Sequence, residues 1–356
     1  MFMPLQKTSA LVCLWLAAAL LGACKGSPPP PVTSTPGIHV FVTDETGGNL
    51  IILDPEHGQI VERIAVGKRP RGLRLSADGR QVLVALSGSP IGGPGVDESK
   101  LPPADRSADG IGIVDLTSRT LVRKFHSGQD PESFAISPDG KTLYVSNEDA
   151  AEMSVLDLAG GTVTNRVKVG EEPEGVTVRP DGREVYVTCE GDNEVVAIDT
   201  AGMKVVAQMK TAARPRAVVF TPDGATAFVT NENGGAVTVI DTASHTVTTT
   251  IELPRPANSP TPPRPMGAVL SADGRQLFVT LGRARAIAVI DVASRKAART
   301  IDDVGARPWG IGLSPDGKKL YTANGPSGDV SIIDIASGSV DKRVSVGGSP
   351  WGIAVK

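Results

Sequence analysis

The chain has 356 residues, with 36 basic and 39 acidic side chains, so its formal net charge is −3 at pH 7. Binding to nucleic acid generally depends on an excess of positive charge that neutralises phosphates, and this balance argues against such a partner. Of the three cysteines, Cys13 is expected to be removed with an export signal and Cys24 to carry a lipid, as argued below. Cys189 is then alone, which excludes an internal disulfide.

Residues 1–23 are predicted to be an export signal. Lys7 precedes an apolar run from Ala10 to Leu21 that is too short to span a bilayer comfortably. The sequence Leu21-Gly22-Ala23-Cys24 resembles a lipobox, so Cys24 is the predicted lipidation site. An ordinary signal peptide cut nearby is the alternative. Lys25 follows instead of Asp, which in a bacterium with two membranes resembles outer-membrane sorting. We therefore expect a lipoprotein of the cell envelope, on the outer membrane facing the periplasm or on the cell surface.

Residues 24–37 are predicted to combine the lipidated cysteine with an unfolded tether. Four consecutive prolines, Pro28 to Pro31, stiffen the segment. At roughly 3.1–3.6 Å per residue, the tether holds the following domain up to about 40 Å from the lipid. The predicted contact with the membrane is therefore an anchor and not a span.

Residues 38–356 repeat one pattern seven times. A proline-centred step starts a short apolar strand at Pro70, Pro131, Pro173, Pro215, Pro265, Pro308 and Pro350. The Asp-Gly turns that follow recur after 42, 42 and 43 residues where the repeats are regular, and after 61 and 50 residues where two repeats carry insertions. A period of about 40–45 residues built only from strand patterns predicts a β-propeller with one blade per repeat.

Each unit is predicted to contain four strands. In the fourth unit these are Val176–Arg179, Val185–Thr188, Ala197–Asp199 and Val205–Met209, each apolar and bounded by turn residues. An aspartate that closes each third strand is expected to accept backbone N–H bonds in the next turn. These aspartates are Asp54, Asp115, Asp157, Asp199, Asp241, Asp291 and Asp334, and the sevenfold repetition marks them as structural.

The two ends of the repeat region complete the ring. The region opens with a second, a third and a fourth strand at Val40–Thr43, Leu50–Asp54 and Ile60–Val66, and it ends with a first strand at Gly352–Val355. The last strand must join the first three in one sheet, which leaves no open edge between the first and last blades. The predicted fold is all-β, a seven-bladed β-propeller in one domain.

The repeat resembles that of the YVTN family of bacterial β-propellers. The unit from Pro131 to Asn147 reads PESFAISPDGKTLYVSN, and FVTN at Phe228–Asn231 and VIDTA at Val239–Ala243 match further parts of the family pattern. The resemblance covers residues 38–356 and implies the propeller fold. It does not imply an activity, since such relatives are mostly exported proteins of undefined role, some of them associated with periplasmic quinoprotein or haem systems.

Motifs for catalysis or cofactor binding do not stand out. The sequence has no C-x-x-C-H, G-x-S-x-G, H-E-x-x-H or P-loop, so no cofactor is predicted. The four histidines fall in different repeats and none maps to the channel, so no metal site is predicted either. Calcium in the acidic loops is an alternative that lacks a motif of fixed spacing. Cys189 is expected to be inert because no histidine lies nearby in the repeat.

Both insertions map to one face of the ring. Residues 87–110 interrupt the second blade, and residues 254–264 precede Pro265, so both lie on the face where the proline steps begin. Two loops rich in Pro and Gly on one face favour a lid or a docking site, and tolerated surface insertions are the alternative.

The residue after each proline is expected to rim the channel, because first strands are innermost in a propeller. In ring order from the closing blade these residues are Trp351, Arg71, Glu132, Glu174, Arg216, Met266 and Trp309. The alternative for Arg71 with Glu132, and for Glu174 with Arg216, is that these neighbours only form ion pairs with each other. The residues around this ring are mainly acidic in blades 3 and 4 and mainly basic in the other blades, where Arg69, Arg264 and Arg307 lie. This uneven distribution of charge favours a partner that binds in one orientation.

Trp309 and Trp351 occupy equivalent positions on adjacent blades. An aromatic pair beside arginines suits the anchor of a protein partner or a stacking surface for a flat ligand, and packing between blades is the alternative. The predicted binding set is Arg69, Arg71, Glu132, Glu174, Arg216, Arg264, Arg307, Trp309 and Trp351. The hypothesis we prefer at this point is a non-catalytic module that docks an exported protein. A protein that handles a small ligand or cofactor is the second hypothesis, and an enzyme using Glu132 and Glu174 is the third.

Overall fold

The computed structural model describes residues 1–2, 37–92, 97–257 and 259–356. The predicted export signal, the lipobox with Cys24, and the tether up to residue 36 lie outside the described residues. Within the described part of the chain, no helix is long and apolar enough to cross a membrane.

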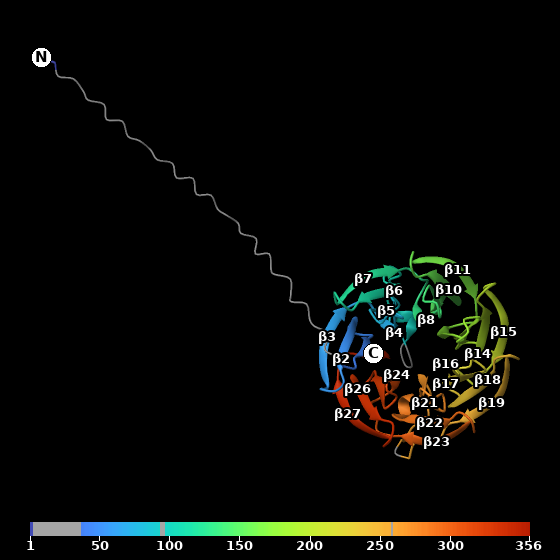
Figure 1. Cartoon of the computed structure of the whole chain (residues 1–356). Helices are drawn as coiled ribbons and strands as arrows, with labels where there is room; N and C mark the ends of the chain where they lie inside the picture. Colours follow the sequence, from blue (N-terminus) through green and yellow to red (C-terminus); the bar gives the residue numbers. More distant parts are fainter. Residues whose placement is uncertain (3–36, 93–96, 258) are drawn as a thin grey trace. The chain divides into compact units, whose positions relative to one another are not determined.

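Seven four-stranded antiparallel sheets form a ring around a central channel (Figure 1). This confirms the predicted seven-bladed all-β propeller. Six sheets use four consecutive strands, and the seventh has the order β28-β1-β2-β3. In that closing sheet Val40 pairs with Val355 and Val42 with Ile353, so the ring closes as the sequence predicts.

The strands of the closing blade and of blades 2 to 4 have the following bounds. They are β28 (Pro350–Val355), β1 (Val40–Asp44), β2 (Asn49–Asp54) and β3 (Gln59–Ala65); β4 (Pro70–Leu75), β5 (Gln81–Leu86), β6 (Gly110–Asp115) and β7 (Thr120–Phe125); β8 (Pro131–Ile136), β9 (Thr142–Asn147), β10 (Glu152–Asp157) and β11 (Thr162–Lys168); and β12 (Pro173–Val178), β13 (Glu184–Cys189), β14 (Glu194–Asp199) and β15 (Lys204–Lys210).

Blades 5 to 7 repeat this arrangement. Their strands are β16 (Pro215–Phe220), β17 (Thr226–Asn231), β18 (Ala236–Asp241) and β19 (Thr246–Glu252); β20 (Ala268–Leu270), β21 (Gln276–Thr280), β22 (Ile287–Asp291) and β23 (Lys296–Ile301); and β24 (Pro308–Leu313), β25 (Lys319–Asn324), β26 (Asp329–Asp334) and β27 (Ser339–Ser345). Three single-turn 3₁₀ helices lie in loops, at Glu98–Lys100, Glu148–Ala150 and Gly282–Ala284.

The hydrophobic core is a series of layers between neighbouring blades. The residues of β13 are buried almost throughout, whereas those of the outer strand β15 are largely exposed. Each core cluster of the described residues joins two adjacent blades; one of them, for example, combines Tyr144 and Met153 of blade 3 with Val187 and Ile198 of blade 4. Because every blade buries both faces against its neighbours, the ring is stable only when it is closed.

Glycine and a hydroxyl residue hold the innermost strands close together. A Cβ atom added at Gly175 would lie 2.1 Å from the carbonyl oxygen of Arg216 in the next blade, so only glycine fits. The hydroxyl of Thr188 on β13 donates to that same carbonyl at 2.9 Å and accepts from the Gly175 N–H at 2.8 Å. This contact explains why the repeat places glycine after the proline step and threonine or serine near the end of the second strand.

The predicted turns are confirmed. The aspartate that ends each third strand accepts a backbone N–H bond in all seven blades, as in the 2.9 Å bond from Ser244 to Asp241. In the sixth blade the first strand is shorter than predicted and begins at Ala268, three residues after Pro265. Just before this strand, the Gly267 N–H donates to the carbonyl of Trp309 in the next blade at 3.1 Å.

Candidate functional site

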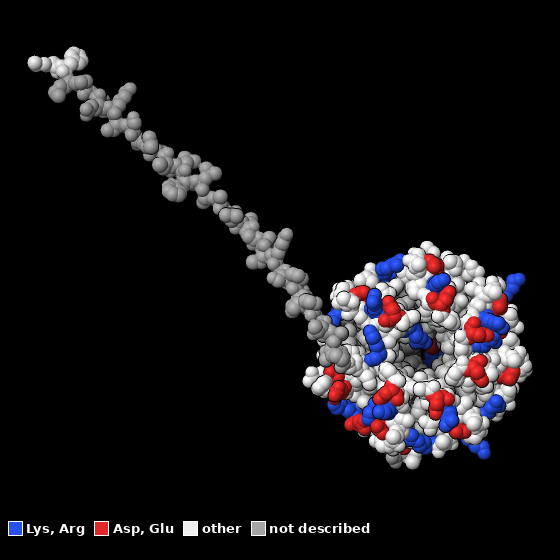
Figure 2. All heavy atoms as spheres, in the orientation of Figure 1, with Lys and Arg blue, Asp and Glu red and all other residues white. Residues whose placement is uncertain are grey.

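A cavity of about 970 Å³ opens at the channel mouth on the face that carries both insertions. Beneath it, a second cavity of about 170 Å³ occupies the channel between the first strands. Glu174, Arg216, Trp309 and Trp351 line both cavities, so they mark the passage from the mouth into the channel. Figure 2 shows the ring hollowed at its centre, with Lys and Arg atoms visible inside the hollow.

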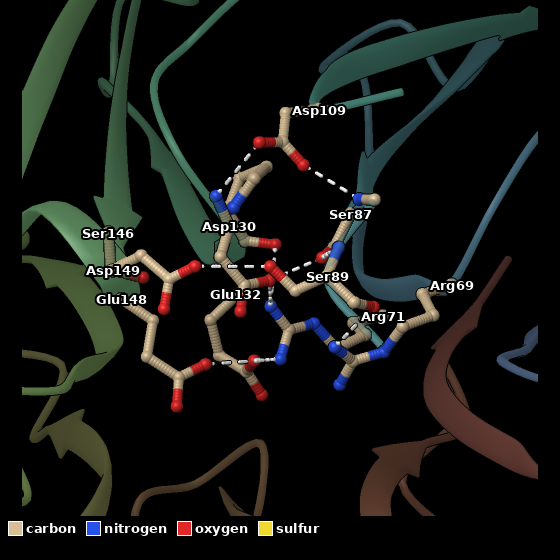
Figure 3. Close-up of polar contacts among 12 residues, drawn as sticks. Arg69, Arg71, Ser87, Ser89, Asp109, Asp130, Glu132, Ser146, Glu148 and Asp149 are labelled. Carbon is tan, nitrogen blue, oxygen red and sulfur yellow. Dashed lines mark hydrogen bonds and ion pairs between the residues drawn. The ribbon is translucent and has the colours of Figure 1, made fainter. Parts of the chain in front are cut away.

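Arg71 is the centre of a buried charge cluster at the mouth. Its guanidinium contacts the carboxylates of Asp130 and Glu132 and lies 3.3 Å from Glu148 (Figure 3). The side chains of Arg71 and Glu132 are each only 3% exposed. Burial opposes ionisation of Asp130, but the charge of Arg71 and a hydrogen bond from Ser87 hold the pKa of Asp130 below its usual value. These contacts join residues of blade 2 to residues of blade 3 in one buried cluster.

Arg216 forms the equivalent cluster between blades 4 and 5. It contacts the carboxylates of Glu174 and Glu190 and lies 2.8 Å from Glu232. Glu190 also lies 2.5 Å from Arg214. Burial raises the pKa of Glu190 to about 8 in spite of Arg214, and the neighbouring Glu148 and Glu232 carboxylates raise it further. One carboxyl of this cluster therefore takes up a proton near neutral pH.

The residue before the proline step adopts a left-handed conformation in five blades, although none of these residues is glycine. The φ angles are 39° at Arg69, 54° at Asp130, 50° at Glu172, 61° at Arg214 and 49° at Arg307. Such angles cost energy for residues with a Cβ atom and often occur at functional sites. All five residues are charged and all five line the mouth cavity, so the backbone strain coincides with the ring of charge.

Trp309 and Trp351 stack on one another at the base of the mouth. Their ring centroids are 5.8 Å apart and the ring planes are inclined by 22°. The guanidinium of Arg307 lies 4.2 Å from the centre of the Trp309 ring, which is a cation–π arrangement. Both tryptophans are only partly buried, so the alternative that they pack wholly between blades is wrong.

The structure brings all nine residues of the predicted binding set to the mouth cavity. The pairing of Arg71 with Glu132 and of Arg216 with Glu174 is confirmed as ion pairs. Because these pairs interleave positive and negative charge, the predicted division of the face into an acidic part and a basic part is less sharp than the sequence suggests. Their role in binding stays a prediction.

Two arginines of the cavity have no carboxylate within ion-pair distance among the described residues. Arg264 donates to the side-chain oxygen of Asn233, and Arg283 is exposed. Arg69, by contrast, lies 3.1 Å from Glu45. The uncompensated positive charge of the mouth is therefore concentrated near blade 6, beside the tryptophan pair of blade 7 and the closing blade.

Sequence reasoning missed several members of the clusters. Glu45 and Glu232 are part of the network, and Glu45, Glu148, Glu190 and Glu232 all directly follow a second strand. An alignment of the seven repeats would reveal this recurring glutamate. Arg74, which lines the inner cavity, was also missed, because it lies four residues after Pro70 and the rim position is the residue directly after the proline.

Cys189 is the one cysteine of the repeat region. Cys189 is buried, and burial raises the pKa of its thiol to about 12, which fits the expectation of an inert cysteine. Among the described residues, no three or more His, Cys, Asp or Glu side chains are grouped so that they would hold a metal ion.

Comparisons with known proteins agree with this architecture. The protein named YncE of Salmonella typhi is 28% identical over 112 residues, which are 32% of this chain, and the match spans only 26% of that relative. The Pseudomonas aeruginosa periplasmic gluconolactonase PpgL superposes with a TM-score of 0.71 at 22% identity, covering 89% of this chain and 98% of PpgL. Kuenenia stuttgartiensis hydrazine synthase gives a TM-score of 0.65 at 23% identity, over 80% of this chain and 89% of that one.

At these identities the structural matches support the fold alone. The family described as "Lactonase, 7-bladed beta-propeller" matches residues 170–350, which is half of the chain. Together with the seven closed blades, this match shows that the chain belongs to the seven-bladed lactonase β-propeller family.

Proposed function

We propose that the channel mouth binds a small, hydroxylated, ring-shaped ligand that carries a negative charge, such as a sugar acid. The observation that carries this proposal is the stacked pair Trp309–Trp351 in a cavity of about 970 Å³ that also holds arginines without a carboxylate partner. Indole rings offer apolar surface to the C–H face of a sugar ring, and guanidinium groups bind carboxylates with paired hydrogen bonds. Numerous buried polar groups favour hydroxyl recognition.

Small-ligand binding fits the cavity better than the docking of a flat protein surface. Arg71, Glu132, Glu174 and Arg216 lie at the bottom of a hollow with their side chains almost fully buried, so a partner protein would reach them only with a protruding loop. Ligand sites are typically concave cavities of several hundred Å³, whereas protein interfaces are broad. Docking of an exported protein by the insertion loops remains a separate proposal.

Two arginines two residues apart provide the test. Arg283 lines the cavity and Arg285 does not, although both are exposed. We expect calorimetry to show that glucuronate binds more tightly than neutral glucose. Arg283→Gln should weaken the binding of the acid about tenfold, and Arg285→Gln should leave it within a factor of two. Equal effects of the two substitutions, or no preference for the acid, would contradict the proposal.

Hydrolysis of a lactone is a second candidate, favoured by Glu148. This carboxyl lines the mouth cavity with its side chain 30% exposed, and burial raises its pKa although Arg71 opposes the shift. A carboxylate of raised pKa is a stronger base than a free one. In the proposed step Glu148 takes a proton from water as the water oxygen adds to the lactone carbonyl. The ring C–O bond then breaks, and its oxygen accepts the proton that Glu148 took from water, which gives the hydroxy acid and restores the carboxylate.

Family membership supports this candidate, since the family takes its description from lactonases and one similar structure is named a gluconolactonase. Acid release from glucono-1,5-lactone, followed by pH-stat above the spontaneous rate, tests it. Glu148→Gln should lower the rate at least a hundredfold, and Glu171→Gln, a neighbouring exposed carboxylate, should not. Binding of the lactone without any rate above background would leave a non-catalytic binding protein.

We also propose the envelope location that the N-terminal sequence predicts. Lipidation at Cys24 is tested by mass spectrometry of the membrane fraction, in which Cys24→Ser should abolish both the lipid adduct and membrane retention. An unmodified wild-type N-terminus after residue 23 would contradict it.

A further inference from the structure

The inner cavity contains one arginine that the mouth clusters do not neutralise. Arg74 lies on β4, three residues below the rim residue Arg71, and it lines the cavity of about 170 Å³ inside the channel. Its one hydrogen bond among the described residues runs from Nη1 to the carbonyl of Leu73, at 2.8 Å. No described carboxylate lies within ion-pair distance of it, in contrast to Arg71 and Arg216.

The other blades add no charge at this level of the channel. The residues at the position equivalent to Arg74 are Ala135, Thr177, Val219, Val269, Gly312 and Ala354. The cavity also contains Ser133 from the neighbouring blade, and its hydroxyl has no hydrogen-bond partner in the described part of the chain. A cation and a free hydroxyl therefore share one small cavity, in which the other charged residues are Glu174 and Arg216, and these two are paired with each other.

The charge of Arg74 has no partner in the channel. The side chain is exposed to the solvent that fills the channel. The surrounding protein walls lower its pKa by desolvation, and no carboxylate opposes this shift. Low-dielectric walls focus the field of such a charge and attract an anion from solution. A guanidinium also presents paired N–H donors that match the oxygens of carboxylate and phosphate groups.

We propose that Arg74 and Ser133 form an oxyanion-binding site inside the channel, separate from the mouth site, that takes a carboxylate or a phosphate group. The site does not depend on the proposed function. A ligand that reaches both sites places its anionic group about 10 Å below the rim, since three strand residues span this distance. Trp351 lies on the blade next to that of Arg74, so such a ligand would pass from the indole to the guanidinium.

Calorimetry with inorganic phosphate, and separately with acetate, tests this site on the whole protein. We expect millimolar or tighter binding of at least one of the two anions, with one anion per chain. Arg74→Gln should weaken the binding at least tenfold. Arg80→Gln, an exposed arginine at the Asp-Gly turn of the same blade, should leave it within a factor of two. Which of the two anions binds more tightly identifies the chemical group that the site prefers.

A thermal readout separates binding from damage to the fold. An anion that binds only the folded state raises the melting temperature, so phosphate should stabilise the wild type and Arg80→Gln but not Arg74→Gln. Arg283→Gln should leave phosphate affinity unchanged, because Arg283 lines the mouth cavity and not the inner one. The inference is overturned if neither anion binds, if Arg74→Gln binds as the wild type does, or if Arg283→Gln abolishes binding. None of these results decides the outcome of the tests with sugar acids, which concern the mouth cavity.

Discussion

The indole rings of Trp309 and Trp351 stack with their centroids 5.8 Å apart, although the two residues are 42 positions apart in the sequence. They occupy the same position in two successive repeats, directly after Pro308 and Pro350. Adjacent blades of a propeller bring equivalent positions together around the channel, so a periodic sequence produces a local aromatic surface. The stack forms the passage from the mouth to the inner channel.

Removal of one ring should weaken ligand binding without unfolding the propeller. Trp351→Ala is expected to lower the affinity for glucuronate about tenfold, because the sugar ring loses the apolar surface of the indole. Trp351→Phe keeps a stacking surface and should retain most of the affinity. Fluorescence titration measures both variants, and an unchanged affinity in Trp351→Ala would exclude this ring from the binding site.

The hydroxyl that joins neighbouring blades should contribute to stability. Thr188→Val keeps the shape of the side chain but removes the buried bond to the Arg216 carbonyl and the part-buried bond from the Gly175 N–H. We expect the free energy of unfolding to fall by about 1–3 kcal/mol, the usual cost of an unsatisfied buried group. Urea denaturation measures this loss. Thr250→Val, on the exposed outer strand β19, is the control and should change stability little.

The close approach of first strands should make glycine indispensable. In Gly175→Ala the added methyl group would meet the carbonyl oxygen of Arg216, and blade 5 would have to move. Overpacking of this kind typically costs about 1–3 kcal/mol. Gly37→Ala is the matched control, because no atom lies within 4 Å of its added Cβ. Equal melting temperatures of the two variants would show that the blades shift freely.

The buried carboxyl of Glu190 should make stability depend on pH. Its pKa is raised from 4.5 to about 8 in the folded protein, so the folded state binds a proton that the unfolded chain has already released. The resulting stabilisation is complete below about pH 4.5 and is lost as the pH rises to about 8. The free energy of unfolding should therefore decrease between about pH 5 and pH 8.

Glu190→Gln provides the measurement for this pH effect. Glutamine does not titrate, so denaturation curves of the variant should depend less on pH across this window than those of the wild type. Glu171→Gln, an exposed neighbour, should reproduce the wild-type slope. A wild-type slope in the Glu190 variant would assign the proton to another carboxyl of the mouth, such as Glu148 beside Arg71.

The sequence by itself determined the strands, the number of blades and the closure of the ring. These features depend on local patterns, since the Asp-Gly turns and the aspartates that end third strands act within a few residues, and repetition then multiplies them. The rim positions followed from the same periodicity, which is why all nine predicted residues line one cavity.

Only the tertiary structure decided which further charges join the Arg–Glu pairs of the rim. Arg71 meets Asp130, 59 residues away, and Arg216 meets Glu190 of the preceding blade, because adjacent blades bring these side chains into one buried space. Nothing in the local sequence distinguishes Arg74 from an ordinary strand residue. Its isolation in the channel depends on the uncharged residues that six other blades place at the same level, and no local pattern contains that information.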